Sequence, residues 1–178
     1  IKIGITPDMM VGDFDTLADE ILIKKYEDAG VKIVRHNPIK DFSDSELAIE
    51  TAYNENIKEI IMLGALGRRF DHAFSNVNML LKYKKMGMDI MIFDEYNKIY
   101  VKSLPFKLEK KTQWGKYISF FSIDKKVIME ELTGVFYTVR NKVVDNVQTP
   151  SLFISNEIIE DYMNAVFYGD LLIVESRD

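Results

Sequence analysis

Residues 59–93 read EIIMLGALGRRFDHAFSNVNMLLKYKKMGMDIMIF, and this segment indicates the fold class of the first half of the chain. Two short apolar runs, 59–63 and 89–93, flank a longer segment in which apolar side chains recur at helical spacing, namely Phe70, Phe74, Val77 and Leu81. That spacing places the four side chains on one stripe of a helix. A strand, a helix and a second strand in this order predict a parallel sheet covered by helices.

The same alternation extends toward the N-terminus, where short runs at 9–11 and 32–35 each precede a helical pattern. The first pattern is Leu17, Ile21, Leu22, Tyr26 and Ala29, and the second is Leu47, Ala48, Thr51 and Ala52. Gly30 and Gly87 follow the first and last helical stretches, where a left-handed C-cap is expected. Residues 1–96 are therefore predicted to form an α/β domain.

After Tyr96 the pattern changes to short segments rich in Val, Ile, Phe and Tyr, separated by turn residues. The predicted strands are 99–104, 117–123, 134–140, 142–147, 152–154, 165–168 and 171–175. Many short strands without long helices predict an antiparallel sandwich or barrel. Residues 97–178 are therefore predicted to form a second, all-β domain.

Composition restricts the class of protein further. A formal net charge of −5 argues against a nucleic-acid partner, because such proteins concentrate positive charge on one face. The absence of cysteine excludes a disulfide framework and a thiolate metal site. No apolar run approaches the ~20 residues of a transmembrane helix. We therefore expect a soluble cytoplasmic protein without a membrane or nucleic-acid partner.

A first polar cluster, GDFDT at 12–16, follows the first strand. Asp13 and Asp15 are two residues apart, so an extended chain points both carboxylates to the same side. Paired carboxylates suit Mg²⁺, which prefers oxygen ligands. The alternative is that Asp15 caps the helix that begins near Thr16.

A second cluster, KDFSDSE at 40–46, follows the strand 32–35. Ser43 and Glu46 fit a capping box, which explains both residues structurally. Lys40 lies outside the box and is able to meet phosphate oxygens as a point charge. Asp41 and Asp44 are able to hold a metal or a hydroxyl, and a helix N-terminus favours phosphate.

A third cluster, GALGRRFDH at 64–72, follows the strand 59–63. Its two glycines allow backbone N–H groups to approach a ligand, and Arg69 is able to grip phosphate with two donors. Asp71 is either a support for this loop or only a helix cap, and His72 is either a ligand or structural. No P-loop and no GxGxxG fingerprint occur in the sequence, so a nucleotide would bind by another arrangement.

Taken together, these motifs resemble the thiamine pyrophosphokinase family over nearly the whole chain. GDFDT at 12–16 resembles the family's GDFDS signature, KDFSDSE at 40–46 resembles KDxTDxE, and the stretch 63–72 resembles GAxGGRxDH with Asn76 following. TGVFY at 133–137 resembles GLxY, and SNE at 155–157 matches a further motif. Arg68 departs from the family, since a second glycine is usual there.

The resemblance implies a Rossmann-like N-terminal domain, a C-terminal β-sandwich and a homodimer with active sites between subunits. It implies that the hydroxyl of thiamine attacks the β-phosphorus of ATP and that AMP leaves. Asp13, Asp15, Asp41 and Asp44 are then expected around Mg²⁺ and the hydroxyl, without any indication of which accepts the proton. Lys40, Arg69, Asp71 and His72 are expected at the ATP phosphates. Ser155 and Asn156 are expected at the aminopyrimidine ring of thiamine, reaching into the partner's site.

Three further expectations accompany this interpretation. Family members begin with another strand and an Asp-Gly-Gly turn, so we expect a segment to precede Ile1. Trp114 is expected to pack in the β-sandwich or to lie at the surface, the alternative being a stacking platform for a flat ligand. The alternative functions are a non-catalytic sensor of thiamine diphosphate or a nucleotide, and an α/β phosphotransferase with another acceptor.

Overall fold

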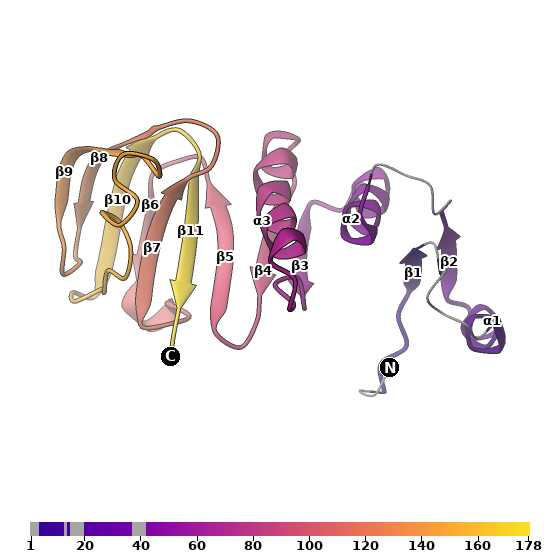
Figure 1. The fold of residues 1–178 in the computed structure, drawn as a ribbon. Helices are drawn as coiled ribbons and strands as arrows, with labels where there is room; N and C mark the ends of the chain where they lie inside the picture. Colours follow the sequence, from indigo (N-terminus) through magenta and orange to yellow (C-terminus); the bar gives the residue numbers. More distant parts are fainter. Residues whose placement is uncertain (1–3, 13, 15–19, 37–41) are drawn as a thin grey trace. The chain divides into compact units, whose positions relative to one another are not determined.

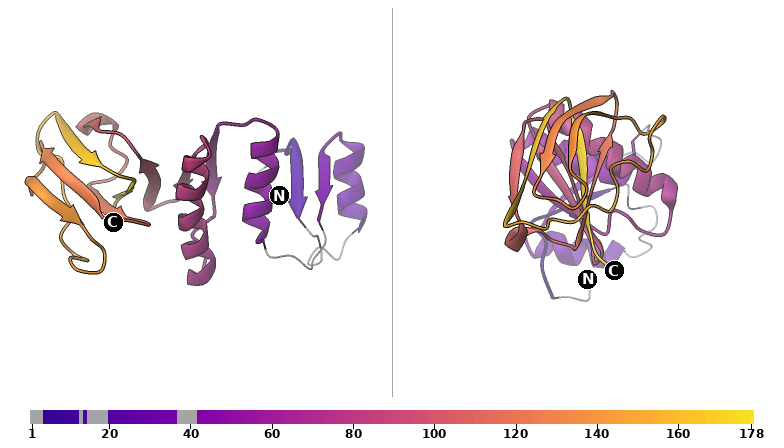
Figure 2. Two further views of the ribbon diagram at one scale, coloured as in Figure 1. Left: turned by 90° about the horizontal axis from the view of Figure 1, so that it is seen from above. Right: turned by 90° about the vertical axis from the view of Figure 1, so that its left-hand side faces the viewer.

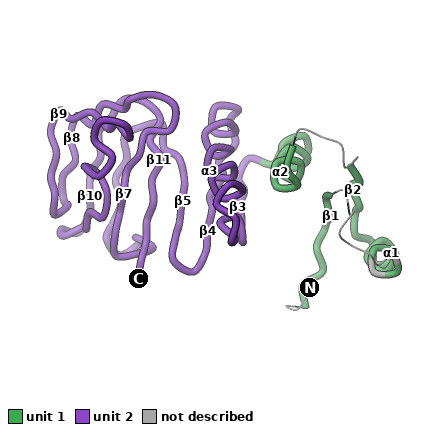
Figure 3. Tube along the Cα trace, in the orientation of Figure 1, with its two compact units in different colours: residues 1–57 green, residues 58–178 purple. Residues whose placement is uncertain are grey.

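The computed structural model describes residues 4–12, 14, 20–36 and 42–178, and the chain divides into two compact units, 1–57 and 58–178 (Figures 1 and 3). Among the helices in these described ranges, none has both the length and the apolar character needed to span a bilayer.

The first unit is built from two parallel strands and two helices. Its elements are β1 (Met9–Gly12), α1 (Glu20–Asp28), β2 (Lys32–Arg35) and α2 (Asp44–Asn54) (Figure 2). β1 pairs with β2 in a register that matches Met9 with Lys32 and Gly12 with Arg35. Both strands therefore end at the same edge of this small sheet, and the strands predicted at 9–11 and 32–35 are confirmed.

Burial within the first unit differs in part from the predicted helix faces. Ile23 is buried on α1, whereas Ile21, which the predicted face included, is 81% exposed. Ile21, Leu22 and Ile23 are consecutive, so periodicity alone allows several phases for this helix. On α2 the buried side chains are Leu47, as predicted, and Ile49.

The second unit contains one long helix and two sheets. Its elements are β3 (Glu59–Leu63), α3 (Phe70–Lys85), β4 (Asp89–Phe93), β5 (Asn97–Lys102), β6 (Phe106–Glu109), the 3-10 helix η1 (Lys110–Thr112), β7 (Tyr117–Ser122), β8 (Val127–Thr133), β9 (Val139–Val144), β10 (Tyr162–Tyr168) and β11 (Leu171–Ser176). One sheet has the strand order β3-β4-β5-β11-β7 and the other has the order β6-β10-β8-β9 (Figure 1).

The five-stranded sheet is mixed. β3 and β4 are parallel, whereas β4 with β5, β5 with β11 and β11 with β7 are antiparallel. Backbone hydrogen bonds thus join β4 to β5 on either side of residues 94–96. The division into domains 1–96 and 97–178 stays a prediction.

Helix α3 confirms the predicted helix but not its predicted buried stripe. Phe70 and Phe74 are exposed, and the buried side chains are Asn76, Met79, Leu80, Leu81 and Tyr83. Of the predicted stripe, Leu81 is buried; the other buried positions, 76, 79, 80 and 83, form a second stripe with the helical spacing i, i+3, i+4, i+7, which includes the polar Asn76. That stripe is the one that becomes buried in this unit.

The two sheets enclose the main hydrophobic core, which includes Ile118, Phe120, Met129, Leu132 and Phe167. The antiparallel pattern predicted after Tyr96 is confirmed, but several strand predictions are wrong. β6 and β8 were not predicted, the segments 134–140 and 142–147 contribute one strand, β9, and 152–154 is a turn. Charged residues interrupt the apolar pattern of β8, and Asn141, which separates the predicted segments 134–140 and 142–147, lies inside β9 with φ 50°.

The mixed α/β class is confirmed. In the described residues the parallel strands form two pairs, β1 with β2 and β3 with β4.

Candidate active site

The carboxyl ends of β1 and β2 form the first part of the candidate site. The backbone N–H of His36 donates to the carbonyl of Gly12 over 3.0 Å, which holds the ends of the two strands together. Phe14 has φ 59°, and the guanidinium of Arg35 lies 5.6 Å from the centre of its ring. The predicted site residues Asp13, Asp15, Lys40 and Asp41 lie outside the described residues.

His36 is a residue at this edge that the sequence interpretation did not single out. Its Nε2 is buried and has no hydrogen-bond partner among the described residues. Buried polar atoms in folded proteins usually have a hydrogen-bond partner, so this ring nitrogen stands out among the described residues. The available signal was its position directly after the parallel strand β2.

The N-terminus of α2 is capped as predicted. Ser43 has extended backbone angles, and its Oγ accepts a hydrogen bond from the backbone N–H of Glu46 over 3.3 Å. Asp44 is the first residue of the helix, where a negative charge is favoured by the helix dipole. Within the described ranges, no three acidic or histidine side chains gather closely enough to hold a metal ion.

The loop 64–69 in the second unit connects parallel strand β3 to helix α3. Gly64 and Gly67 have φ 73° and 35°, in the region that favours glycine. Arg68 does not adopt a positive φ, so the loop takes this side chain without the strain that loss of a glycine implies. The carbonyl of Ala65 accepts a hydrogen bond of 2.7 Å from the amide of buried Asn76, which fixes the loop to the helix.

Arg69 and Asp71 form a bidentate pair at the start of α3. Nε and Nη2 of Arg69 donate to the two carboxylate oxygens of Asp71 over 3.1 and 2.5 Å. Oδ1 of Asp71 also accepts the backbone N–H of His72 over 3.0 Å. The Arg69 hydrogen bonds are the first cause that lowers the pKa of Asp71, and this pair raises the pKa of Arg69.

All three side chains at this helix start are exposed. The two hydrogen bonds to Asp71 hold the guanidinium of Arg69, which stands open to solvent at the end of the glycine loop. A planar cation held by one carboxylate and presented at the end of a parallel strand suits the oxygens of a phosphate.

A second candidate region lies in the all-β part. There Asn156 holds the loop that contains Phe136 and Tyr137, called the aromatic loop below. Asn156 is 4% exposed, and its Oδ1 accepts the backbone N–H of Tyr137 while its Nδ2 donates to the Tyr137 carbonyl, each over 2.9 Å. Oδ1 also accepts the N–H of Glu157. Most of the hydrogen-bonding capacity of this amide is thus used on the backbone.

The loop that Asn156 holds presents two aromatic rings to solvent. Phe136 and Tyr137 are 65% and 60% exposed and lie edge to face, with ring centres 4.9 Å apart. Ser155 is exposed and has φ 54°, and its N–H is held by Oγ of Ser119. The sequence motifs included these aromatic residues but assigned them no role.

Gly134 is required by the turn that leads into this aromatic loop. It has φ 75°, and a Cβ at this position would lie 2.0 Å from the carbonyl oxygen of Tyr162. No other residue fits without moving the backbone of β10, which explains the glycine of this motif.

The loop 64–69 and the aromatic loop lie at opposite edges of the five-stranded sheet. The first follows β3 at one edge, and Asn156 forms a bridge with Ile118 of β7 at the other. Four interstrand steps of about 4.8 Å separate these edges by roughly 20 Å. One copy of this unit therefore does not bring the two loops together.

Trp114 packs against other side chains of the protein, but its ring neighbour Phe93 belongs to β4, outside the predicted all-β part. Its ring lies 4.3 Å from that of Phe93 on one side, and the guanidinium of Arg177 lies 4.1 Å from its centre. Both contacts come from the chain itself, which supports the structural role of this tryptophan over a ligand platform.

A glycine-containing loop between a parallel strand and a helix, with an oriented arginine at the helix start, defines a class of α/β proteins that bind anions at strand ends. The family model described as "Thiamin pyrophosphokinase, catalytic domain" matches residues 1–92. The chain belongs to the thiamine pyrophosphokinase family, and the resemblance seen in its motifs is confirmed.

Individual relatives agree over most of the chain. It is 29% identical to the thiamine pyrophosphokinase of Bacillus subtilis (strain 168) over 179 residues, covering 98% of this chain and 81% of the relative. The crystal structure of a Bacillus subtilis thiamine pyrophosphokinase superposes with a TM-score of 0.84 at 29% identity, over 99% of this chain and 82% of the other. That of Geobacillus thermodenitrificans gives 0.78 at 30% identity, over 97% and 78%.

Proposed function

We propose that this protein transfers a diphosphate group from ATP to the hydroxyl of thiamine, giving thiamine diphosphate and AMP. The observation that carries the proposal is the oriented Arg69 beside the glycine loop at the end of β3, in a chain of this family. An exposed guanidinium held in one orientation is suited to binding a polyphosphate substrate. A helix start with only a structural role does not need such a group.

Arg69 is assigned to the phosphates of ATP, with Asp71 holding the guanidinium in position. Support comes from the bidentate contact between them and from the exposure of both side chains. His72 follows on the same helix start and is exposed, so it is assigned to the same phosphates. Lys40 is assigned there from its motif.

Asp13, Asp15, Asp41 and Asp44 are assigned to a Mg²⁺ site near the thiamine hydroxyl. Carboxylate oxygens are the donors that Mg²⁺ takes, and the first two aspartates directly follow the end of β1. The bound ion would neutralise charge on the phosphates. Asp44, the member of this set that the structure describes, stands at a helix N-terminus, a place that also favours an anionic substrate.

The reaction asks little covalent work of these side chains. The hydroxyl oxygen of thiamine forms a bond to the β-phosphorus of ATP, and the bond from that phosphorus to the oxygen shared with the α-phosphate breaks. AMP leaves with that oxygen, and the hydroxyl proton passes to an aspartate of the set or to solvent. Positioning of the two substrates and neutralisation of phosphate charge supply most of the rate in such transfers.

The thiamine ring is assigned to the aromatic loop, with Ser155 beside it. Phe136 and Tyr137 offer exposed aromatic surface, and rings that stack on each other gain about 0.5–1.5 kcal/mol beyond burial. Asn156 is assigned as a positioning residue, because its amide is engaged with the Tyr137 backbone. This refines the expectation that Asn156 itself contacts the aminopyrimidine.

The protein is proposed to act as a homodimer in the cytoplasm. Within one chain the loop 64–69 and the aromatic loop are roughly 20 Å apart. A site that uses both loops therefore needs the aromatic loop of one subunit beside the loop 64–69 of the other, which supports a homodimer. A Rossmann-like fold is proposed for the N-terminal α/β half, supported by the parallel pairing of β1 with β2 and of β3 with β4.

The test is to incubate the full chain with ATP, MgCl₂ and thiamine and to measure AMP, ADP and thiamine diphosphate by chromatography. AMP release that depends on thiamine is expected. Arg69→Ala should raise the KM for ATP, whereas Lys142→Met, a matched loss of positive charge on exposed β9, should leave both substrates' KM unchanged.

Two other outcomes would point to the other functions. Binding of thiamine diphosphate or ATP without AMP release indicates a sensor, and ADP formed with a different acceptor indicates another phosphotransferase. Either result overturns the proposal. Equal activity with and without added Mg²⁺, after treatment with EDTA, would show that the reaction does not need the metal.

A further inference from the structure

Asn76 is the polar member of the buried stripe of α3. Its neighbours in that stripe are Met79, Leu80 and Tyr83, and Asn76 itself is 5% exposed. Burial of an amide costs free energy unless the amide is hydrogen-bonded, and an apolar residue would serve the packing of this helix at least as well. Packing alone thus does not explain why residue 76 is an asparagine.

The amide of Asn76 reaches the loop 64–69. Its Nδ2 donates to the carbonyl oxygen of Ala65 over 2.7 Å, and the Ala65 side chain is buried as well. Gly64 and Gly67, on either side of this contact, both have positive φ, and a Cβ at either would meet no atom of the described residues within 4 Å. The glycines are therefore needed for the shape of the backbone and not for space, and Asn76 holds the backbone between them.

The contact also fixes the direction of the next backbone donor. The described peptide bonds include no cis bond, and a trans peptide is planar, so its C=O and N–H point in opposite directions. Because the Ala65 carbonyl points at Asn76, the N–H of Leu66 in the same peptide points away from Asn76. Within the part of the chain that the structure describes, this N–H donates no hydrogen bond to the protein. One oriented backbone donor is thus available in the loop that precedes Arg69.

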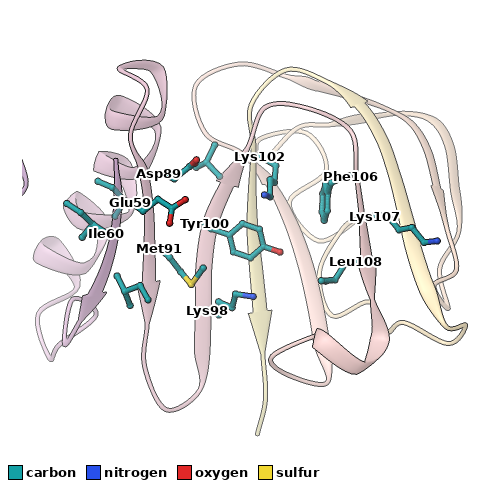
Figure 4. A pocket seen from close by; sticks show the side chains of 13 residues that line it. Glu59, Ile60, Asp89, Met91, Lys98, Tyr100, Lys102, Phe106, Lys107 and Leu108 are labelled. Atoms are coloured by element: carbon teal, nitrogen blue, oxygen red, sulfur yellow. The ribbon is translucent and has the colours of Figure 1, made fainter. Parts of the chain in front are cut away.

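The two ends of the sheet differ in how well they suit a phosphate. A pocket toward the amino ends of β3 and β4 has the carboxylates Glu59 and Asp89 in its wall together with lysines (Figure 4). A phosphate would meet negative charge there. The loop 64–69 lies at the carboxyl end of β3 and leads through Arg69 into the N-terminus of α3, and both of these favour an anion. The Leu66 N–H therefore lies at the end of the sheet that suits a phosphate.

We propose that Asn76 is a positioning residue for ATP, which holds the Ala65–Leu66 peptide so that the Leu66 N–H donates to a phosphate oxygen. The inference rests on the proposed phosphate role of the loop 64–69 and adds to it one donor and the side chain that orients this donor. A backbone N–H that meets an anionic oxygen forms a charge-assisted hydrogen bond, and a donor already held in place loses little freedom on binding. Asn76 is buried, so it acts through the peptide and does not touch the nucleotide.

The first experiment replaces the amide by an apolar group. Asn76→Leu should raise the KM for ATP about tenfold, because a hydrogen bond to a charged group is no longer held in place, while kcat and the KM for thiamine stay within about twofold. Asn146→Leu is the control, since it removes an asparagine that holds a different backbone, at Ser122, and it should leave the KM for ATP unchanged. An unchanged KM for ATP in Asn76→Leu overturns the proposal. Equal rises in the KM of both substrates also overturn it, because they indicate a general loss of structure.

The second experiment follows the Leu66 N–H by NMR and needs no turnover. The full chain is labelled with nitrogen-15 leucine, and the Leu66 signal is the one that Leu66→Ile removes. Titration with tripolyphosphate should move this signal saturably to higher proton frequency, because the proton is drawn toward an anionic oxygen. The signal of Leu104, which is exposed beyond the carboxyl end of β5 and hence at the other end of the sheet, should stay in place. A Leu66 signal that moves no more than that of Leu104 contradicts the proposal, even if Asn76→Leu does not fold.

The outcomes separate this inference from the proposed function. Thiamine-dependent AMP release together with an unmoved Leu66 signal leaves the reaction in place and refutes the role of Asn76. A Leu66 signal that moves with tripolyphosphate, in a chain that releases no AMP, supports the phosphate donor and refutes the transfer reaction.

Discussion

Replacement of Asn156 by alanine tests whether this residue holds the aromatic loop. The substitution removes the acceptor of the Tyr137 and Glu157 N–H groups and the donor to the Tyr137 carbonyl. A buried group left without a partner costs about 1–3 kcal/mol, but Tyr137 is 60% exposed, so water replaces part of the loss. We expect the free energy of unfolding to fall by about 3 kcal/mol.

The loss should be matched by weaker use of thiamine. If the Phe136 and Tyr137 rings lose their fixed position, about 1 kcal/mol of ring contact is lost, which raises the KM for thiamine roughly fivefold. The KM for ATP should not change, because the hydrogen bonds of the Asn156 side chain hold Tyr137 and Glu157 and none of them reaches the loop 64–69 of the same subunit. Urea unfolding followed by Trp114 emission and steady-state AMP release measure the two effects.

Asn146→Ala is the matched control. Asn146 makes the same two-bond contact with a backbone, since its side chain accepts the N–H of Ser122 and donates to the Ser122 carbonyl, but it is exposed. Its loss should cost less stability and leave the KM for thiamine unchanged. An Asn156→Ala protein as stable as Asn146→Ala, with an unaltered KM for thiamine, would refute the role assigned to Asn156.

The remaining predictions concern the phosphate and metal side of the site and one glycine. Asp13→Asn should abolish thiamine-dependent AMP release while the melting temperature stays nearly the same, and a fully active variant would remove Asp13 from the metal site. The contact between Asp71 and Arg69 should persist above the ordinary pKa of an aspartate and be lost only as the pH falls through the lowered pKa of Asp71. In the wild type the KM for ATP should therefore rise in that acidic range. Asp71→Asn should show a raised KM for ATP at neutral pH and no such acid dependence. Identical pH profiles for the two proteins would contradict this role of Asp71. Gly134→Ala should lower the free energy of unfolding by about 3 kcal/mol or more, since a Cβ would lie 2.0 Å from the Tyr162 carbonyl oxygen and the positive φ is strained; a urea midpoint equal to that of the wild type would exclude the clash.

The parallel strands and the helix caps could be predicted from the sequence because each has a local cause. The runs 32–35, 59–63 and 89–93 coincide with strands, since each is a short apolar segment bounded by polar residues or glycine. Ser43 caps α2 through a contact only three residues away, which a local motif encodes.

Features that depend on distant partners could not be predicted in the same way. The buried stripe of α3 is selected by the sheet it covers, and the sequence offered a second stripe with Phe70 and Phe74. β8 carries Glu130 and Glu131 in its middle, and its identity as a strand rests on pairing with β9 and β10. The strand β9 contains Asn141 at positive φ, which reads locally as a turn.

The same difference between local contacts and contacts of distant segments applies to the candidate site. The residues of the loop 64–72 could be selected from the sequence, and the contact of Arg69 with Asp71 spans only two residues. The engagement of Asn156 with Tyr137 joins segments 19 residues apart. Motifs identify such residues, but only the fold distinguishes a side chain that meets a substrate from one that holds a loop.

Backbone hydrogen bonds join each neighbouring pair of strands in the order β3-β4-β5-β11-β7, and they fix the width of this sheet. Stretching it across its strands would break a whole row of backbone bonds at once, so thermal motion bends or twists it far more readily than it lengthens it. The distance between the loop 64–69 and the aromatic loop is therefore set by the number of strands between them. Changes in side chains at either end alter how firmly a molecule is gripped, while a different span would require a strand to be gained or lost.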